Sequence, residues 1–211
     1  MSEKTVWDWT TAEFLAESAS SAPTPGGGSV SAYVGALGAS MVCMVANLTI
    51  GKEKYKDVEP QAKEILAKGE KLLADLKAGL TDDISVFSGF MDALKLPRDT
   101  EEQKQARSAK MQEVLITATD TPLGIAQNCY AVLELAKELA PIGNKGAISD
   151  VGVAAYLAES ALKAAMLSVD INLPQVKDPS YQDKVKTERE RLFAQAEALK
   201  KETVDIVQSR L

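Results

Sequence analysis

Apolar residues recur at intervals of three and four along most of the chain, the spacing that places them on one face of an α-helix. Helices are expected after Thr10, over 29–50, over 58–76, after Thr81, from Thr100 to about 139, over about 150–169 and from about 180 onward. No segment alternates between apolar and polar residues as a half-buried strand does, and no hairpin signal occurs. We therefore expect an all-α fold, a single-domain helical bundle of six to eight helices with no sheet, spanning residues 1–211.

Particular residues should set where these helices begin and end. Gly79 is expected to break or kink the helix over 58–76, so that residues 81–83 cap the next one. Pro122 predicts a kink or a new first turn, and Ser149 predicts a helix cap. The buried stripe of the helix after Thr81 is expected to comprise Ile84, Phe87, Phe90, Met91 and Leu94.

The stretch Pro23-Thr24-Pro25-Gly26-Gly27-Gly28-Ser29 opens the longest uncharged part of the chain. Proline fixes φ and glycine permits close backbone approaches. Ser29 can cap the following helix, whose first-turn N–H groups would favour an anionic or carbonyl-bearing ligand. The stretch is not a phosphate P-loop, because Gly28-Ser29-Val30 lacks the lysine of that motif. The alternative is a loop and helix start that bind nothing.

The run over 29–50 has 22 residues without a charge. As a helix it would be about 33 Å long, enough to cross a bilayer. Because it is rich in small and polar residues and poor in Leu, Ile and Phe, we interpret it as the buried core helix of a soluble protein. We expect no membrane association. Gly35, Gly38 and Ala39 suit close helix contacts, either within the chain or across a dimer interface.

The composition excludes several kinds of partner, catalytic site and metal site. The net charge of −6 and the pI of about 4.9 give no indication of nucleic acid as a partner. Histidine is absent, which removes Ser-His-Asp and Cys-His nucleophiles and zinc sites built on Cys and His. Cys43 and Cys129 lie in apolar patterns and are expected to be free buried thiols. No secretory signal opens the chain, so we expect a cytoplasmic protein.

Without histidine, carboxylates become the leading candidates for acid–base chemistry. Asp82 and Asp83 follow Gly79, and Asp150 follows a glycine-containing turn. Acidic residues are also common in a first helical turn for purely structural reasons, and that alternative stays open for all three.

Lysines and asparagines supply further candidates. Lys52, Lys54 and Lys56 could receive an anionic tail or could simply be solvated at a helix end. Asn144 and Asn172 could cap helices or bind a ligand, and the pattern does not decide between these roles.

Several separate motifs resemble the folate-dependent cyclodeaminase/cyclohydrolase family. They occur in the family's order over about residues 10–205: the stretch 23–29, Met44 to Tyr55, Asp83 with Phe87, Leu94 to Pro97, Ala118 to Leu123, Gly143-Asn144, Ser149 to Ala154, and Asn172. The family includes the cyclodeaminase half of formiminotransferase-cyclodeaminase and stand-alone bacterial methenyltetrahydrofolate cyclohydrolases.

The resemblance implies an all-helical homodimer that binds a tetrahydrofolate derivative near the glycine-rich loop, with no metal and no bound cofactor. Asp83 and Asp150 correspond to the family's candidate catalytic carboxylates. The residues implied as substrate contacts are Pro25, Gly26, Gly27, Gly28, Ser29, Lys52, Tyr55, Asn144 and Asn172. If the folate carries a polyglutamate tail, the lysines at 52, 54 and 56 are where its carboxylates are expected.

Two departures bear on the substrate. Mammalian cyclodeaminases have Asp-x-Asp where this chain has Thr81-Asp82-Asp83, and an asparagine common near the end of the penultimate helix is Ser168 here. The acidic pair and the single-domain length are closer to the stand-alone cyclohydrolases.

We therefore expect hydrolysis of 5,10-methenyltetrahydrofolate to 10-formyltetrahydrofolate, with Asp83 or Asp150 as the base. The first alternative is a cyclodeaminase that releases ammonia from 5-formiminotetrahydrofolate. The second is a non-catalytic helical scaffold that binds folate.

Overall fold

The protein is described over residues 5–211 by a computed structural model, and in this part of the chain all regular secondary structure is helical, without a strand. The six α-helices are α1 (Thr11–Ser18), α2 (Gly27–Thr49), α3 (Glu59–Leu94), α4 (Glu101–Leu139), α5 (Ile148–Asn172) and α6 (Pro179–Arg210). Short 3-10 helices are η1 (Val6–Asp8), η2 (Glu53–Val58), η3 (Lys145–Ala147) and η4 (Leu173–Gln175). The all-α prediction is confirmed.

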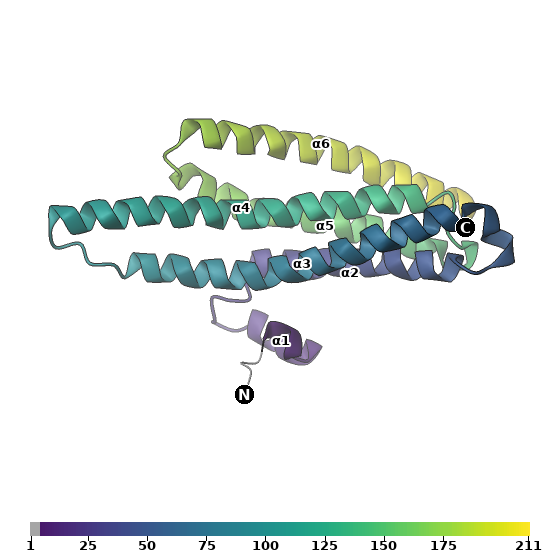
Figure 1. The fold of residues 1–211 in the computed structure, drawn as a ribbon, viewed down its shortest axis with the longest axis horizontal. Helices are drawn as coiled ribbons and strands as arrows, with labels where there is room; N and C mark the ends of the chain where they lie inside the picture. The colour runs from purple at the N-terminus through teal and green to yellow at the C-terminus, as the bar shows by residue number, and fades with distance from the viewer. Residues whose placement is uncertain (1–4) are drawn as a thin grey trace.

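Helices α2 to α5 form an elongated bundle in which successive helices reverse direction (Figure 1). Helix α6 covers α4 and α5 and is fastened at both ends. The Tyr181 hydroxyl donates to Asp120 Oδ1 at 2.7 Å, and Arg210 Nη2 donates to the Gly143 carbonyl at 2.8 Å. The N-terminal segment lies beside α2 and α3, where Phe14 stacks on Tyr33 with ring centroids 4.7 Å apart.

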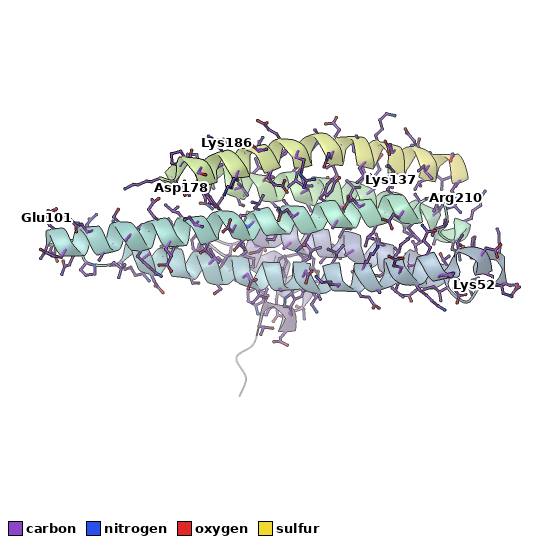
Figure 2. All side chains as sticks on the ribbon, turned by 45° about the horizontal axis from the view of Figure 1, so that its top comes forward. Lys52, Glu101, Lys137, Asp178, Lys186 and Arg210 are labelled. Atoms are coloured by element: carbon purple, nitrogen blue, oxygen red, sulfur yellow. The ribbon has the colours of Figure 1, made fainter. Side chains whose placement is uncertain are left out.

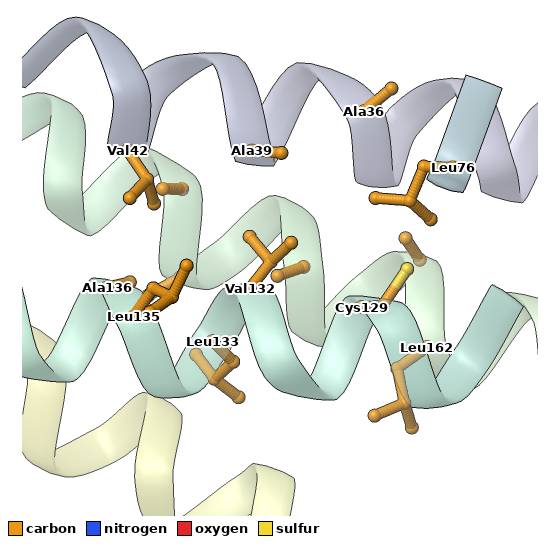
Figure 3. Packing of buried hydrophobic residues seen from close by; sticks show 14 of the residues in the cluster. Ala36, Ala39, Val42, Leu76, Cys129, Val132, Leu133, Leu135, Ala136 and Leu162 are labelled. Atoms are coloured by element: carbon orange, nitrogen blue, oxygen red, sulfur yellow. The ribbon is translucent and has the colours of Figure 1, made fainter. Parts of the chain in front are cut away.

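The core is built from small side chains of α2 against larger ones of its neighbours. Ala39 and Val42 of α2 face Val132 and Leu135 of α4 (Figure 3). Ala39, Val42 and Val132 are fully buried. Small residues on α2 let the helix axes approach closely, so the larger side chains of the neighbouring helices pack directly against it.

Both cysteines are free and buried, as predicted. Burial raises the pKa of the Cys43 thiol to about 11 and that of Cys129 to about 12. The reactive thiolate is therefore scarce at neutral pH, and both side chains act as core residues.

Three predicted helix boundaries are wrong. Helix α3 continues through Gly79 and through residues 81–83. A Cβ on Gly79 would lie 3.0 Å from Ile125 Cγ1, so this glycine allows α4 to approach rather than breaking α3. Of the two alternatives predicted at Pro122, the new first turn is wrong, because helix α4 continues through this residue. Helix α5 begins at Ile148, so Ser149 lies inside the helix instead of capping it.

The predicted buried stripe after Thr81 is also wrong in part. Phe87 and Phe90 are only half-buried, and Met91 and Leu94 are 38% and 39% exposed. The reason is geometric: the hairpin of α3 and α4 extends beyond the other helices (Figure 1), so nothing covers its tip.

Helix α2 and the segment Lys145–Gln175 are long and apolar enough to cross a membrane, but more than half of each apolar window is buried inside the bundle. Helix α2 is not buried on every side, however. It exposes Val30, Leu37 and Leu48, and the adjacent α5 exposes Val153, Tyr156, Leu167 and Ile171.

Candidate active site

The glycine-rich loop and α3 meet at the N-terminus of α2. Gly26 is the N-cap and the helix starts at Gly27, two residues before the predicted cap at Ser29. Instead of capping, the Ser29 hydroxyl donates to Asp83 Oδ2 on α3 at 2.6 Å. A Cβ on Gly28 would lie 2.2 Å from Asp83 Oδ1. Only glycine at position 28 therefore lets the carboxylate sit against the start of α2.

Burial raises the pKa of Asp83 above its ordinary value, although hydrogen bonds from the Ser29 hydroxyl and backbone N–H oppose this. The half-buried carboxyl thus accepts a proton more readily than an exposed aspartate does. A raised pKa in a pocket is typical of a residue that takes up or releases a proton during a reaction.

Asp83 faces a pocket of about 310 Å³. The pocket is lined by Pro23, Thr24, Gly26, Gly27, Gly28, Asp83, Val86, Phe87, Phe90, Ala118, Thr121, Ser168, Ile171 and Asn172. Asp83 is the sole ionisable residue among them. The remaining walls are aromatic, aliphatic or neutral polar groups, an arrangement suited to a flat organic ligand with a positive charge near the carboxylate.

Two further predicted contacts lie at this pocket. Asn172 ends α5, and its Nδ2 donates to the Ala118 carbonyl of α4 at 2.8 Å. Pro25 follows a cis peptide bond and is buried between the pocket-lining residues Thr24 and Gly26. The structure therefore brings Asp83, the loop, Ser29 and Asn172 together.

The other predicted site residues gather at the opposite end of α2. Asn144 Nδ2 donates to the Leu48 carbonyl, and Thr49 Oγ1 accepts from the Asn144 N–H, both at 2.8 Å. The Lys145 N–H donates to the Tyr55 hydroxyl, also at 2.8 Å. These bonds hold the loop before α5 against the end of α2.

Lys52 and Asp150 lie at this same end, Lys52 exposed before η2 and Asp150 in the first turn of α5. Lys52 is at the opposite extreme of the bundle from Glu101, at the tip of the hairpin of α3 and α4 (Figure 2). Helix α2 has 23 residues, so roughly 35 Å separates its two ends. Within one chain, Asp150 and Asp83 do not share a pocket.

Sequence reasoning did not assign Val86, Phe90, Thr121 or Ile171 to the site, and it treated Phe90 as core. If α3 had been predicted as one continuous helix, part of this wall would have been predictable from the sequence. Asp83, Val86, Phe87 and Phe90 are spaced by three and four residues and therefore share one helix face. Among residues 5–211, no three His, Cys, Asp or Glu side chains gather where they could hold a metal ion.

The fold and pocket define a class: an all-helical protein with a small-molecule site built around one carboxylate at a helix N-terminus. Residues 10–191 match the protein-family model described as formiminotransferase-cyclodeaminase. The chain belongs to this family.

Three relatives show which members of the family this chain is similar to. The methenyltetrahydrofolate cyclohydrolase of Methylorubrum extorquens is 44% identical over 94% of this chain and 95% of its own length. The formimidoyltransferase-cyclodeaminase of Sus scrofa is 30% identical over 93% of this chain but only 36% of its own. A crystal structure of formiminotetrahydrofolate cyclodeaminase from Thermotoga maritima superposes with a TM-score of 0.87 at 28% identity, covering 97% of this chain and 98% of that one.

Proposed function

We propose that this protein hydrolyses 5,10-methenyltetrahydrofolate to 10-formyltetrahydrofolate. The observation that carries the proposal is the pocket at Gly28, in which Asp83 is the one ionisable residue. Support from the comparisons is the 44% identity to a methenyltetrahydrofolate cyclohydrolase over nearly the whole of both chains.

The chemistry of the substrate fits this pocket. Its bridging carbon belongs to a cationic amidinium between N5 and N10, so it is already electrophilic. The Asp83 carboxylate would attract that cation and take a proton from the attacking water as the C–O bond forms. The neutral adduct then opens: the C–N5 bond breaks, N5 receives the remaining hydroxyl proton and the carbonyl of the 10-formyl group forms. The proton on Asp83 leaves to solvent.

We further propose a homodimer formed through α2 and α5. Val30, Val34, Leu37, Met41, Met44 and Leu48 recur at alternating four- and three-residue spacing along α2, and all are exposed or half-buried. Val153, Tyr156, Ala164, Leu167 and Ile171 continue the face on α5. An uncharged, heptad-spaced face of two adjacent helices suits isologous packing against a second copy.

Such a dimer offers a place for Asp150, Lys52, Tyr55 and Asn144 in catalysis. If the two-fold axis crosses the helices, the two α2 helices run antiparallel and the partner's Asn144 end lies beside the Gly28 pocket. Asp83 and Asp150 would then act in one site while coming from different protomers, with Asp150 positioning water or returning a proton.

Subunit mixing tests this arrangement. Asp83→Asn and Asp150→Asn homodimers are each expected to be inactive. After random exchange, half of the dimers are mixed, and each mixed dimer has one site with both substitutions and one with neither. About a quarter of wild-type activity should return. No recovery, with exchange verified by mass spectrometry, would contradict a shared site, and full activity of Asp150→Asn alone would remove that residue from the mechanism.

The second candidate is formiminotetrahydrofolate cyclodeaminase activity, favoured by the superposition on the Thermotoga maritima enzyme. In that reaction N10 attacks the formimino carbon on N5 and ammonia leaves. Two assays on the purified protein separate the candidates: loss of the methenyltetrahydrofolate chromophore, corrected for spontaneous hydrolysis, and ammonia release from 5-formiminotetrahydrofolate. Rapid hydrolysis without ammonia is expected. Ammonia release would favour the deaminase, and folate binding without either reaction would favour a scaffold.

We also infer a cytoplasmic location, supported by two free buried thiols. Recovery of the protein in the membrane or secreted fraction after cell fractionation would contradict this.

A further inference from the structure

Helix α4 carries a proline, Pro122, in its interior. Proline has no backbone N–H, so it cannot donate the hydrogen bond that residue 122 of an α-helix gives to the carbonyl of residue 118. Its ring also crowds that carbonyl, which belongs to Ala118. Pro122 is buried, and Ala118 lines the pocket that Asp83 faces. A carbonyl that lacks its helical donor therefore lies at the wall of the candidate active site.

The side chain of Asn172 replaces the missing donor. Its Nδ2 reaches from the end of α5 to α4 and donates to the Ala118 carbonyl at 2.8 Å. Ala118 is half-buried, and a backbone carbonyl held away from water needs a partner. Pro122 and Asn172 therefore act as a pair, because the first leaves the carbonyl open and the second binds it.

This hydrogen bond decides which atom of the Asn172 amide is left for a ligand. The side chain makes no capping hydrogen bond at the start of η4, whereas Asn144 caps η3 through its Oδ1. A free amide can turn either its N–H groups or its oxygen toward a ligand. With Nδ2 bound to α4, the Oδ1 atom accepts no hydrogen bond from residues 5–211. Because Asn172 lines the pocket, its available group there is an acceptor.

An acceptor at this position complements the rest of the pocket. Asp83 is also an acceptor when ionised, and the hydroxyls of Thr121 and Ser168 can either donate or accept. Two pocket side chains of fixed polarity are thus acceptors, an arrangement that favours a ligand carrying N–H groups. The pyrimidine ring of a pterin has such groups, a ring N–H and an amino substituent.

We propose that Pro122 is a positioning residue: it leaves the Ala118 carbonyl open for Asn172, whose Oδ1 then accepts a hydrogen bond from an N–H of the substrate's pterin ring. The inference rests on the proposed function for the identity of that ring. The alternative is that the bond only fastens α5 to α4. The two roles differ in what they affect, since a fastening contributes to stability and an oriented acceptor contributes to substrate affinity.

Pro122→Ala separates these roles. It restores an N–H at position 122, which then donates to the Ala118 carbonyl within the helix and releases Asn172. We expect KM for methenyltetrahydrofolate to rise about three- to tenfold, the loss of one hydrogen bond to the ligand, with kcat changed less than about twofold. Tm should stay within about 4 °C of wild type, because better helix propensity offsets the lost contacts of the buried ring. A lower Tm with unchanged KM would show that the bond only fastens the helices.

Gly124→Ala is the matched control. It adds a Cβ to the same part of α4, where nothing lies within 4 Å of it, and raises helix propensity without giving Ala118 a donor. Its KM should stay within about twofold of wild type. A rise equal to that of Pro122→Ala would show that a stiffer α4, rather than the released Asn172, weakens substrate binding, and would overturn the proposal.

A double-mutant cycle tests whether Pro122 acts through Asn172. Asn172→Ala should raise KM by a similar factor, and Pro122→Ala/Asn172→Ala should lie within about twofold of Asn172→Ala alone. The double variant should also melt higher than Asn172→Ala, because the restored N–H pairs with the Ala118 carbonyl. Effects on KM that multiply would contradict a shared route, and an unchanged KM in Asn172→Ala would remove the acceptor.

Binding of 5-formyltetrahydrofolate, followed by calorimetry, needs no turnover. Its Kd should be about three- to tenfold higher for Pro122→Ala and Asn172→Ala than for wild type, and unchanged for Gly124→Ala. If methenyltetrahydrofolate is not turned over, the proposed function fails, while these Kd values still decide whether Pro122 positions Asn172. Normal turnover with equal Kd and KM in wild type and Pro122→Ala would keep the function and overturn the positioning role.

Discussion

The two ends of α2 both bring together polar side chains from distant parts of the chain, but their hydrogen bonds differ. At the C-terminal end, Asn144, Tyr55 and Thr49 bond to one another and to nearby backbone groups. At the N-terminal end, Asp83 accepts from Ser29 and otherwise faces a neutral pocket. A mutually satisfied cluster stabilises a loop, whereas a carboxylate of raised pKa beside an open pocket is available for chemistry. Residues that belong to the same family motifs therefore differ in what they do in this chain: those at one end of α2 stabilise a loop, and Asp83 at the other end faces the pocket.

The largest effect that tests this contrast is expected from Gly28→Ala. The new Cβ would overlap Asp83 Oδ1, so the carboxylate or the start of α2 must move. A displacement of about 1 Å at a reacting group costs roughly 10²-fold in rate, and we expect kcat/KM for methenyltetrahydrofolate to fall at least that far. Gly89→Ala is the control, because a Cβ there has open space. Similar activities in the two variants would show that Gly28 does not position the carboxylate.

A smaller effect, mainly on stability, is expected at the opposite end. Asn144→Ala removes the bonds to Leu48 and Gly146 and should lower the free energy of unfolding by about 1–3 kcal/mol, measured by urea denaturation. Tyr55→Phe, which keeps the ring but loses the acceptor for Lys145, should cost less. Because the proposed dimer places this end beside the partner's pocket, a fall in kcat/KM smaller than that of Gly28→Ala is expected as well. A fall as large as that of Gly28→Ala at unchanged stability would contradict the contrast between the two ends.

The smallest effect concerns the stability of Asp83→Asn. A folded-state pKa above the ordinary value means that the protonated carboxyl stabilises the fold at low pH. This contribution is lost as the pH rises through the folded-state pKa, so at pH 7 the ionised carboxylate costs stability. We expect the variant to melt no lower than wild type at pH 7, with its relative advantage shrinking as the pH falls toward 4. A Tm clearly below wild type at pH 7 would show that the carboxylate is needed for folding.

The helices themselves were predictable because the three- and four-residue spacing of apolar side chains sets the buried face of each one. The ends of the helices were less predictable, because contacts between residues distant in sequence determine where a helix begins and ends. Gly79 is an example: it looks like a helix breaker alone but accommodates Ile125 in the packed structure.

The site was predictable in part. The family resemblance singled out Asp83, and the structure places it within α3, opposite the start of α2 and at the pocket, rather than in a first turn. Phe90 and Thr121 become pocket walls only when α3 and α4 pair. The distance from Asp83 to Asp150 depends on which ends of the bundle the loops join, and no local pattern encodes that.

The most direct test of the account is kcat/KM for methenyltetrahydrofolate in Asp83→Asn and Asp82→Asn, measured side by side. The two acids are adjacent in sequence, but Asp82 is exposed and does not line the pocket. Loss of a general base typically costs 10²–10⁴-fold. We expect a loss of about that size for Asp83→Asn and less than about a twofold change for Asp82→Asn. Wild-type-like turnover by a folded Asp83→Asn protein would contradict the proposal that this carboxylate performs the hydrolysis.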